Sequence, residues 1–180
     1  MTATRDLLRE VGYERLTIAE VAARAGVGKQ TIYRWWSAKA AIVTDCVLDG
    51  VVGIPLLAAQ ATGDAIEDLR TWLVVSHRVI ASPESGPLFR ALAAAAAADA
   101  HAVAQLDERF ISPLSTSIAQ SLRAGIGAGQ IRPDVDVAAT ADLLLGSLTY
   151  AIVTRDRDAL DRLPGTLDII LRGLANTPDR

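Results

Sequence analysis

Lys29, Gln30 and Thr31 are consecutive polar residues at the start of a short predicted helix, directly after the turn formed by residues 25–28. A lysine can donate hydrogen bonds to guanine O6 and N7, and a glutamine can form two hydrogen bonds with adenine. Residues at the start of the second helix of a helix-turn-helix face the base edges of the major groove. In isolation such residues would be read as solvated surface, whereas their place in this motif predicts base recognition.

The helix before the turn has clear start and stop signals. Thr17 is a good N-cap, and Glu20, three residues later, completes a capping-box pattern. Apolar residues then recur at helical spacing from Ile18 onwards, and Gly26 ends the helix.

The helix after the turn is predicted to run from about Lys29 to Trp36, with Ile32 and Trp36 one turn apart and facing inward. Helices this short are not stable alone. We therefore expect them to pack against a first helix that ends near Gly12 and a fourth helix over about 38–52.

Side chains suited to phosphate contacts flank the same two helices. Thr17 lies at a helix N-terminus, where hydroxyl, amides and dipole favour an anion. Tyr33 and Lys39 offer a phenol donor and a positive charge. Thr17 can act as cap and phosphate ligand at once, while packing inside the head is the alternative for Tyr33 and Trp35.

The stretch from Leu16 to Lys39 reads LTIAEVAARAGVGKQTIYRWWSAK and resembles the TetR (AcrR-like) family of bacterial repressors. Glycine, tyrosine, aromatic and lysine residues fall at the family spacing over about Leu7 to Val43. The resemblance implies an all-α homodimer of about nine helices that binds double-stranded operator DNA. It also implies base-facing positions at Lys29, Gln30, Thr31 and Arg34, and backbone contacts from Thr17, Tyr33 and Lys39.

Two residues depart from the family pattern. The family commonly has serine where Gly28 stands, so a hydroxyl cap and its phosphate bond are missing while the backbone amide remains. Trp35 replaces the usual histidine, and it either stacks on a sugar or packs in the head. The first helix is also short at its start, as though a preceding basic arm were absent.

Charge is distributed unevenly along the chain, whose net charge is -3. Residues 1–45 carry seven Lys/Arg against five Asp/Glu, and the remaining residues carry eleven against sixteen. A basic head on an acidic body is typical of a protein that touches DNA with one end. We therefore expect a helix-turn-helix DNA-binding domain over 1–45 and a helical effector-binding and dimerisation domain over 46–180.

The body is predicted to contain five more helices, so the fold class is all-α with about nine helices. Apolar residues make up 51% of the chain but aromatics only 4%, which favours helices packed through Ala, Leu, Val and Ile. Pro113 lies within one predicted helix and is expected to kink it. The five helices are expected at about 64–82, 86–99, 103–128, 137–155 and 159–175.

Apolar stripes on the last two predicted helices form the candidate dimer interface. The segment 129–134 before them, GQIRPD, resembles the entry to the last two helices of family members. That resemblance favours a four-helix interface, and the alternative is that each stripe faces its own core. The stripes consist of Val137, Ala141, Leu144, Leu148, Ile152, Leu163, Leu167, Ile170, Leu171 and Leu174.

Five large or polar-tipped side chains stand out in the Ala/Leu-rich body as candidates to line an effector pocket. Ordinary packing is the alternative for each. Few charges of the body are expected to point inward, which predicts a small, largely apolar or aromatic effector. The candidates are Trp72, His77, Phe89, Phe110 and Tyr150.

Catalytic, metal and membrane functions have little support. His77 and His101 lack metal-ligand spacing, Cys46 is the only cysteine, and no glycine-rich phosphate loop or nucleophile elbow occurs. There is no signal-peptide pattern, and the longest apolar runs, such as 92–98, are too short to span a bilayer. We expect a cytoplasmic protein that is not an enzyme and needs no cofactor or metal.

Three functions remain open. The leading one is a repressor that binds a palindromic operator as a dimer and is released by a small-molecule effector. The second is a DNA-binding regulator without such an effector. The third is a helical ligand-binding or interaction protein whose shortened head no longer binds DNA.

Overall fold

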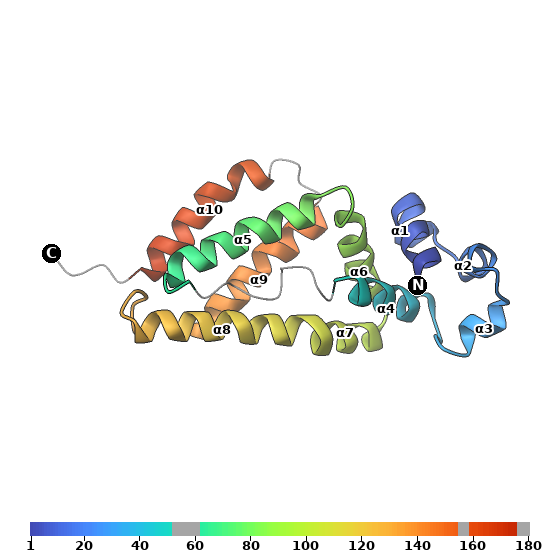
Figure 1. Cartoon of the computed structure of the whole chain (residues 1–180), viewed down its shortest axis with the longest axis horizontal. Helices are drawn as coiled ribbons and strands as arrows, with labels where there is room; N and C mark the ends of the chain where they lie inside the picture. The colour runs from blue at the N-terminus through green and yellow to red at the C-terminus, as the bar shows by residue number, and fades with distance from the viewer. Residues whose placement is uncertain (52–61, 155–158, 176–180) are drawn as a thin grey trace. The chain divides into compact units, whose positions relative to one another are not determined.

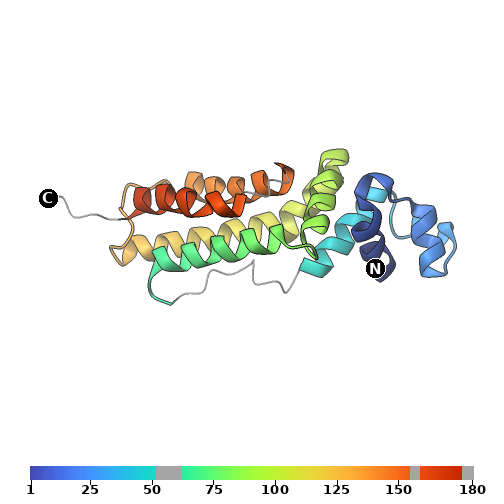
Figure 2. The same cartoon turned by 90° about the horizontal axis from the view of Figure 1, so that it is seen from above.

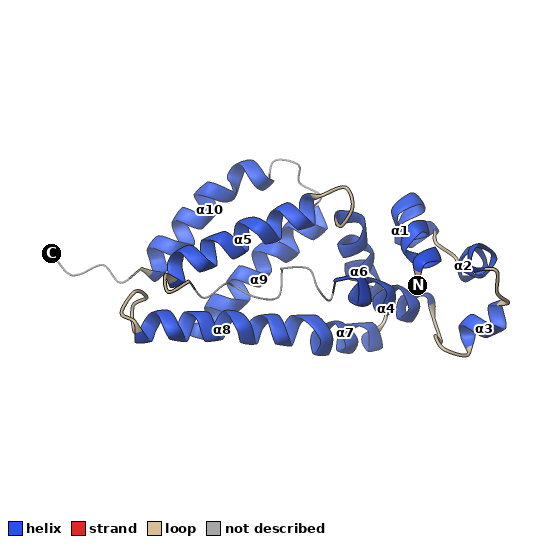
Figure 3. Ribbon diagram, in the orientation of Figure 1, coloured by secondary structure: helices blue, strands red, loops and turns tan. Residues whose placement is uncertain are grey.

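The regular elements of the chain, where the structure describes it, are helices (Figures 1 and 3). The computed structural model describes residues 1–51, 62–154 and 159–175, and within these ranges the only extended pairing is an isolated antiparallel bridge between Ile131 and Ala175. The expected all-α class is confirmed, since small aliphatic side chains let helices pack closely without a sheet.

The chain forms two compact units. The first unit combines Met1–Gly53 with Ser82–Ile111, and the second combines Ile54–Ala81 with Ser112–Arg180. In the first unit, α6 packs against both α1 and α4. The helices of this unit are α1 (Thr2–Arg15), α2 (Ile18–Ala25), α3 (Lys29–Tyr33), α4 (Lys39–Val51), α6 (Gly86–Ala98) and α7 (Ala100–Leu106).

The second unit is a four-helix arrangement centred on α5 (Ala65–Ala81). Helix α5 packs against α8 (Ser112–Gly127), α9 (Val137–Thr154) and α10 (Ala159–Leu174). In Figure 2, α9 and α10, coloured orange to red, form one layer, and α5 and α8 form the layer beneath it.

Helix α2 begins and ends where the sequence signals lie, whereas α1 extends past Gly12 to Arg15 and α3 ends at Tyr33, before the expected Trp36. The Thr17 hydroxyl accepts the Glu20 amide at 3.2 Å and the Glu20 carboxylate accepts the Thr17 amide at 3.0 Å, so the capping box is confirmed. Gly26 adopts a left-handed conformation at φ 69° and ends α2. Gly12, at φ 75°, interrupts α1, which resumes for a short turn.

The expected helix over 103–128 is divided. A π-helical turn over Asp107–Ile111 separates α7 from α8, and Pro113 is the second residue of α8. A proline has no amide to donate to the carbonyl four residues earlier, and its ring crowds that carbonyl. The wider π turn accommodates this loss, in keeping with the interruption expected at Pro113.

Most of the apolar stripe residues assigned to the dimer interface are instead part of the core of the second unit. Leu144 is fully buried and Leu148 is only 5% exposed, because the inner side of α9 packs against α5 and α8. The assignment is corrected for the buried residues, since a side chain enclosed by its own chain is not available to a partner, and it stays a prediction for the half-buried ones. The buried members are Ala141, Leu144, Leu148, Leu163, Leu167, Leu171 and Leu174, and the half-buried ones are Val137, Ile152 and Ile170.

Candidate functional site

The four candidate base-facing residues, Lys29, Gln30, Thr31 and Arg34, are all exposed on or just after α3. Helix α3 is only five residues long, and the backbone amide of Arg34 continues it by donating to the carbonyl of Gln30. The structure therefore brings these polar side chains together on one short helical segment in solvent.

Two apolar anchors on the same segment point inward. Ile32 is buried, and the half-buried Trp36 donates its indole N–H to a carboxylate oxygen of Asp45 on α4 at 2.7 Å. The inward orientation expected for both residues is confirmed. The Asp45 bond was not anticipated, because a single acidic residue nine positions away carries no sequence signal.

Thr17 is already engaged with a negative charge. Its hydroxyl donates to Glu20 Oε2 at 2.7 Å and accepts from the Glu20 amide, so its single O–H donor is already in use. A phosphate at the N-terminus of α2 would therefore rely on the free backbone amides of the first turn. The phosphate contact assigned to Thr17 stays a prediction.

Lys39 holds α1 and α4 together. Its ammonium donates to the carbonyls of Tyr13 at 2.9 Å and Glu14 at 3.3 Å, and it lies 4.3 Å from the centroid of the Tyr13 ring. The positive charge thus stabilises the carbonyl end of α1. This contact joins residues 26 positions apart in the chain, and the sequence pattern did not indicate it. The phosphate contact of Lys39 also stays a prediction.

Tyr33 and Trp35 are surface residues, with 54% and 69% of their area exposed. Trp35 carries the Arg34 guanidinium over its ring, 5.4 Å from the centroid. Packing inside the head, the alternative considered for both, is therefore not observed, and both rings are free to meet a sugar-phosphate chain.

Gly28 is the N-cap of α3 and provides no side-chain hydrogen bond to it. Its φ of -74° is accessible to any residue, and a Cβ placed there would lie 4.0 Å from the Thr31 hydroxyl. The structure therefore has room for the serine that the family commonly carries. Backbone amides at the start of α3 remain the only donors that this position offers.

The candidate pocket residues do not form one cluster. Trp72 and His77 are buried on α5 in the second unit. Phe89 and Phe110 lie in the first unit, with ring centroids 6.4 Å apart and planes tilted by 49°. Tyr150 is 60% exposed on the outer side of α9, so its assignment to a pocket is corrected.

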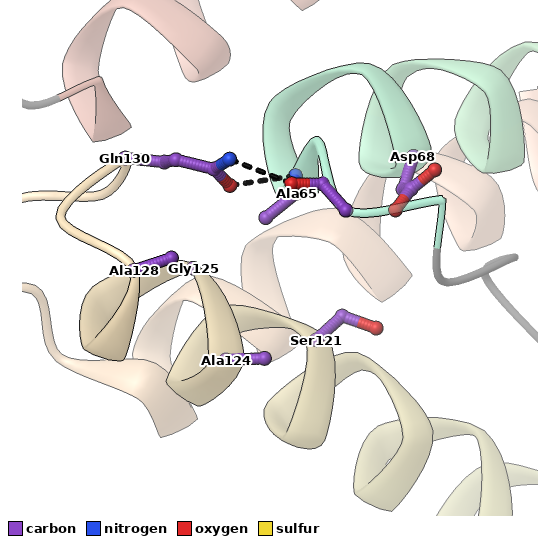
Figure 4. A pocket seen from close by; sticks show the side chains of 8 residues that line it. Ala65, Asp68, Ser121, Ala124, Gly125, Ala128 and Gln130 are labelled. Atoms are coloured by element: carbon purple, nitrogen blue, oxygen red, sulfur yellow. Dashed lines mark hydrogen bonds between the residues drawn. The ribbon is translucent and has the colours of Figure 1, made fainter.

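A cavity of about 210 Å³ does occur in the second unit, between the start of α5 and the end of α8 (Figure 4). The Gln130 side chain closes one side by accepting the Ala65 amide at 2.9 Å and donating to the Gly63 carbonyl at 2.7 Å. None of the five candidate pocket residues lines this cavity. Its lining consists of Gly63, Ala65, Asp68, Ser121, Ala124, Gly125, Ala128 and Gln130.

The burial of His77 on α5 predicts that the stability of the second unit depends on pH. Burial holds the pKa of His77 below its usual 6.5, although hydrogen bonds to the backbone at Leu73 and Ser147 oppose the shift. The unfolded chain therefore binds the proton first as the pH falls. We expect the free energy of unfolding to decrease below about pH 6.5, by up to about 1.4 kcal/mol per pH unit.

Urea unfolding between pH 7.5 and 5 measures this dependence, with His77→Gln and the exposed His101→Gln compared with the parent. The His77 variant should lose much of the slope and the His101 variant should keep it. An unchanged slope in His77→Gln would assign the acid sensitivity to other groups.

The outer surface of the second unit carries an apolar face that the sequence pattern did not reveal. We use the name outer face for the exposed apolar side chains of two helices that lie in one layer (Figure 2): Leu143, Tyr150 and Val153 on α9, and Ile169 on α10, which is 77% exposed. Gly146, Gly165 and Gly173 lie on the same two helices, and a Cβ at any of them would meet no atom within 4 Å. Helix α9 is therefore apolar on its outer side as well as its inner side.

Because of this second apolar side, α9 has the length and composition of a membrane span. Over Val137–Thr154 its mean hydropathy is 1.5, and 17% of that stretch is buried. The sequence predicted no membrane-spanning segment because its unbroken apolar runs are short. Helix α9 is not an unbroken run, since it contains scattered Thr, Ser and Gly and a single charged residue, Asp142. One such helix is weak evidence for a membrane, and an outer face that binds another protein surface has the same composition.

Two family models match the chain. One, described as "Bacterial regulatory proteins, tetR family", matches residues 1–46, and the other, "Tetracyclin repressor-like, C-terminal domain", matches residues 59–166. The chain is also 31% identical over 153 residues to YdeS of Bacillus subtilis (strain 168), an uncharacterized HTH-type transcriptional regulator. That match covers 85% of this chain and 76% of YdeS.

Solved structures share the fold over almost the whole chain. FadR from Bacillus subtilis, in complex with stearoyl-CoA, matches with a TM-score of 0.73 and 18% identity, covering 96% of each chain. The TetR family transcription regulator SCO0332 matches with a TM-score of 0.66 and 30% identity, covering 96% of this chain and 94% of its own.

Proposed function

Because this chain belongs to the tetR family of bacterial regulatory proteins, and is thus a DNA-binding transcriptional regulator rather than an enzyme, we propose that it is a repressor. It binds a palindromic operator as a homodimer and leaves the operator when a small molecule binds. The observation that carries the proposal is the exposed polar segment of α3, held from beneath by Ile32 and Trp36.

The recognition surface consists of Lys29, Gln30, Thr31 and Arg34, which contact base edges in the major groove. Their exposure supports this, as does the position of three of them at the start of the second helix of the motif. The backbone contacts come from Thr17, Gly28, Tyr33, Trp35 and Lys39. Of these, the exposed rings of Tyr33 and Trp35 and the amides around Gly28 have the best access to a phosphate chain.

Gln30→Ala tests the recognition surface. Loss of two hydrogen bonds to one base should cost about 1–3 kcal/mol on the best site and relax the preference at one base position. Selection of bound sequences from a random duplex library gives the best site, and fluorescence anisotropy then gives the Kd of each variant. Gln120→Ala, which removes an exposed glutamine from α8, is the matched control. If Gln30→Ala selects the parent's site with the parent's affinity, the base-facing surface lies elsewhere.

The homodimer forms through the outer face of α9 and α10. An exposed apolar face of this kind marks an interaction surface in a soluble protein. The glycines beside it let helices of two protomers approach closely, and Tyr150 and Ile169 supply large side chains to bury. Covering this face also removes the membrane-like character of α9, which agrees with a cytoplasmic regulator.

The effector is a small, largely apolar molecule. The solved FadR structure holds stearoyl-CoA in the same fold, and the buried Trp72 and His77 of α5 offer one apolar and one polar-tipped side chain for a ligand. Thermal-shift screening of apolar and of multiply charged compounds tests the assignment. Stabilisation by the charged class alone would contradict it.

A regulator without a small-molecule effector is the second candidate. The cavity at the start of α5 has a volume of about 210 Å³, which is less than the range of about 300–1,000 Å³ typical of pockets for drug-sized ligands. Absence of a shift with either compound class, together with operator binding, would favour this candidate.

A further inference from the structure

Both oxygens of the Asp45 carboxylate bind side chains from distant parts of the first unit. Oδ2 accepts the Trp36 indole N–H at 2.7 Å, and Oδ1 accepts a guanidinium N–H of Arg109 at 2.9 Å. The second guanidinium nitrogen of Arg109 binds Asp49, one turn further along α4. The Asp45 carboxylate thus connects Trp36, at the end of the helix-turn-helix, with Arg109, which lies 64 positions after Asp45.

Trp36 is firmly attached to the recognition segment. Its backbone amide donates to the carbonyl of Ile32 at 2.9 Å, so the indole has a fixed place relative to α3. Helix α3 has only five residues and buries Ile32 alone among them. A short helix with one buried side chain has little packing to fix its rotation, and the Trp36–Asp45 bond supplies a second point of attachment.

Arg109 reaches Asp45 from the π-helical turn over Asp107–Ile111. Pro113 lacks the amide that would otherwise bond the Arg109 carbonyl, which favours this turn over a regular α-helix. Pro113 therefore favours the turn from which Arg109 reaches Asp45.

Arg109 is the main hydrogen-bond partner of the Asp45 Oδ1 atom. The Gln105 amide nitrogen is 3.5 Å from the same oxygen, which is beyond the usual range for such bonds. The side chains of Asp45 and Arg109 are 28% and 31% exposed. A charge pair that is largely shielded from water is held more firmly than an exposed one.

We propose that Asp45 and Arg109 are positioning residues for DNA recognition. Arg109 fixes the Asp45 carboxylate, Asp45 fixes the Trp36 indole, and Trp36 fixes the rotation of α3 toward the base edges. This inference rests on the recognition surface proposed above. It assigns a function in DNA binding to the π turn over Asp107–Ile111, although no residue of this turn is proposed to contact a base.

The test compares two removals and one conservative replacement. Arg109→Gln removes the guanidinium, Trp36→Phe removes the indole donor, and Arg109→Lys keeps a positive charge near Asp45. Each protein is titrated against the selected operator duplex and against a random duplex of equal length. The two removals should each weaken operator binding on the order of tenfold, as expected for loss of one hydrogen bond to a charged group.

Binding to the random duplex should stay at the parent's level, because that affinity depends on phosphate charge and not on the rotation of α3. Arg109→Lys should recover part of the operator affinity. The double variant Trp36→Phe/Arg109→Gln should bind the operator no worse than the weaker of the two single variants. Both changes break the same series of contacts, from Arg109 through Asp45 to Trp36. Arg70→Gln, which removes an arginine from its partner Glu67 on α5, is the matched control and should bind like the parent.

Parental operator binding by Arg109→Gln would overturn the proposal. So would an equal loss on both duplexes, which indicates a general loss of the fold, or a double variant whose loss is the product of the two single losses. Gln30→Ala is titrated alongside. If Gln30→Ala binds the operator like the parent while Arg109→Gln binds it more weakly, the proposed recognition surface is rejected and the positioning function is kept. If Gln30→Ala binds more weakly while Arg109→Gln binds like the parent, the recognition surface is kept and the positioning function is rejected.

Discussion

Tyr150→Arg should convert the dimer into a monomer that keeps its helical content and loses specific DNA binding. Tyr150 is 60% exposed on the outer face of α9, so the folded protomer can accept an arginine there. In the proposed dimer the new charge would be buried without a partner, which is strongly unfavourable. Two linked heads bind more tightly than one by a factor of about 10² to 10⁴, and the monomer loses that gain.

On one sample, light scattering measures the oligomeric state, circular dichroism measures the helical content, and an operator titration measures specific DNA binding. Thr116→Arg places the same charge on an exposed position of α8 and should stay dimeric. Ile169→Arg changes the outer face from α10 and should repeat the effect of Tyr150→Arg. If both Tyr150→Arg and Ile169→Arg remain dimeric, the dimer interface lies on another surface.

Leu148→Arg, only two residues from Tyr150, should instead unfold the second unit. Leu148 is 5% exposed and lies on the inner side of α9, against the core of its own protomer. Burial of an unpaired charge together with overpacking should cost about 4 kcal/mol or more. That cost is a large part of the roughly 5–15 kcal/mol by which native proteins are stable.

Thermal unfolding followed by circular dichroism tests this expectation, with Leu148→Met as the control. The methionine conserves volume and should cost less than about 1.5 kcal/mol. A Leu148→Arg protein that melts like the parent and becomes monomeric would return Leu148 to the interface. The pair of arginine variants therefore distinguishes the two sides of one helix.

The helix-turn-helix could be predicted from sequence because its signals are local. A capping box, a left-handed glycine and an apolar repeat each act within one turn of helix, so Thr17, Glu20 and Gly26 indicate their own structure. The inward positions of Ile32 and Trp36 follow from the same periodicity. Contacts such as Lys39 with Tyr13, or Asp45 with Arg109, depend on packing between distant segments and leave no trace in local spacing.

The outer face, through which we propose that the protein dimerises, could not be predicted because α9 is apolar on two sides. Periodicity finds an apolar stripe but does not say whether the chain's own core or a second chain covers it. The stripe through Leu144 and Leu148 was the more regular one, and it packs inside the protomer. The outer residues Leu143 and Val153 alternate with Gly146 and threonines, so their pattern is weaker although their side chains are exposed.

The discontinuous first unit limits how this regulator can be re-engineered. The simplest chimeric repressor would exchange the reading head at a single cut, here near residue 53. Such a cut would leave behind Ser82–Ile111, and with it α6, which packs against both α1 and α4, and Arg109, which binds Asp45. The transplanted head would expose apolar surface to water and would tend to aggregate. A functional graft must carry both segments, so operator specificity in this protein is exchanged as two pieces of sequence rather than one.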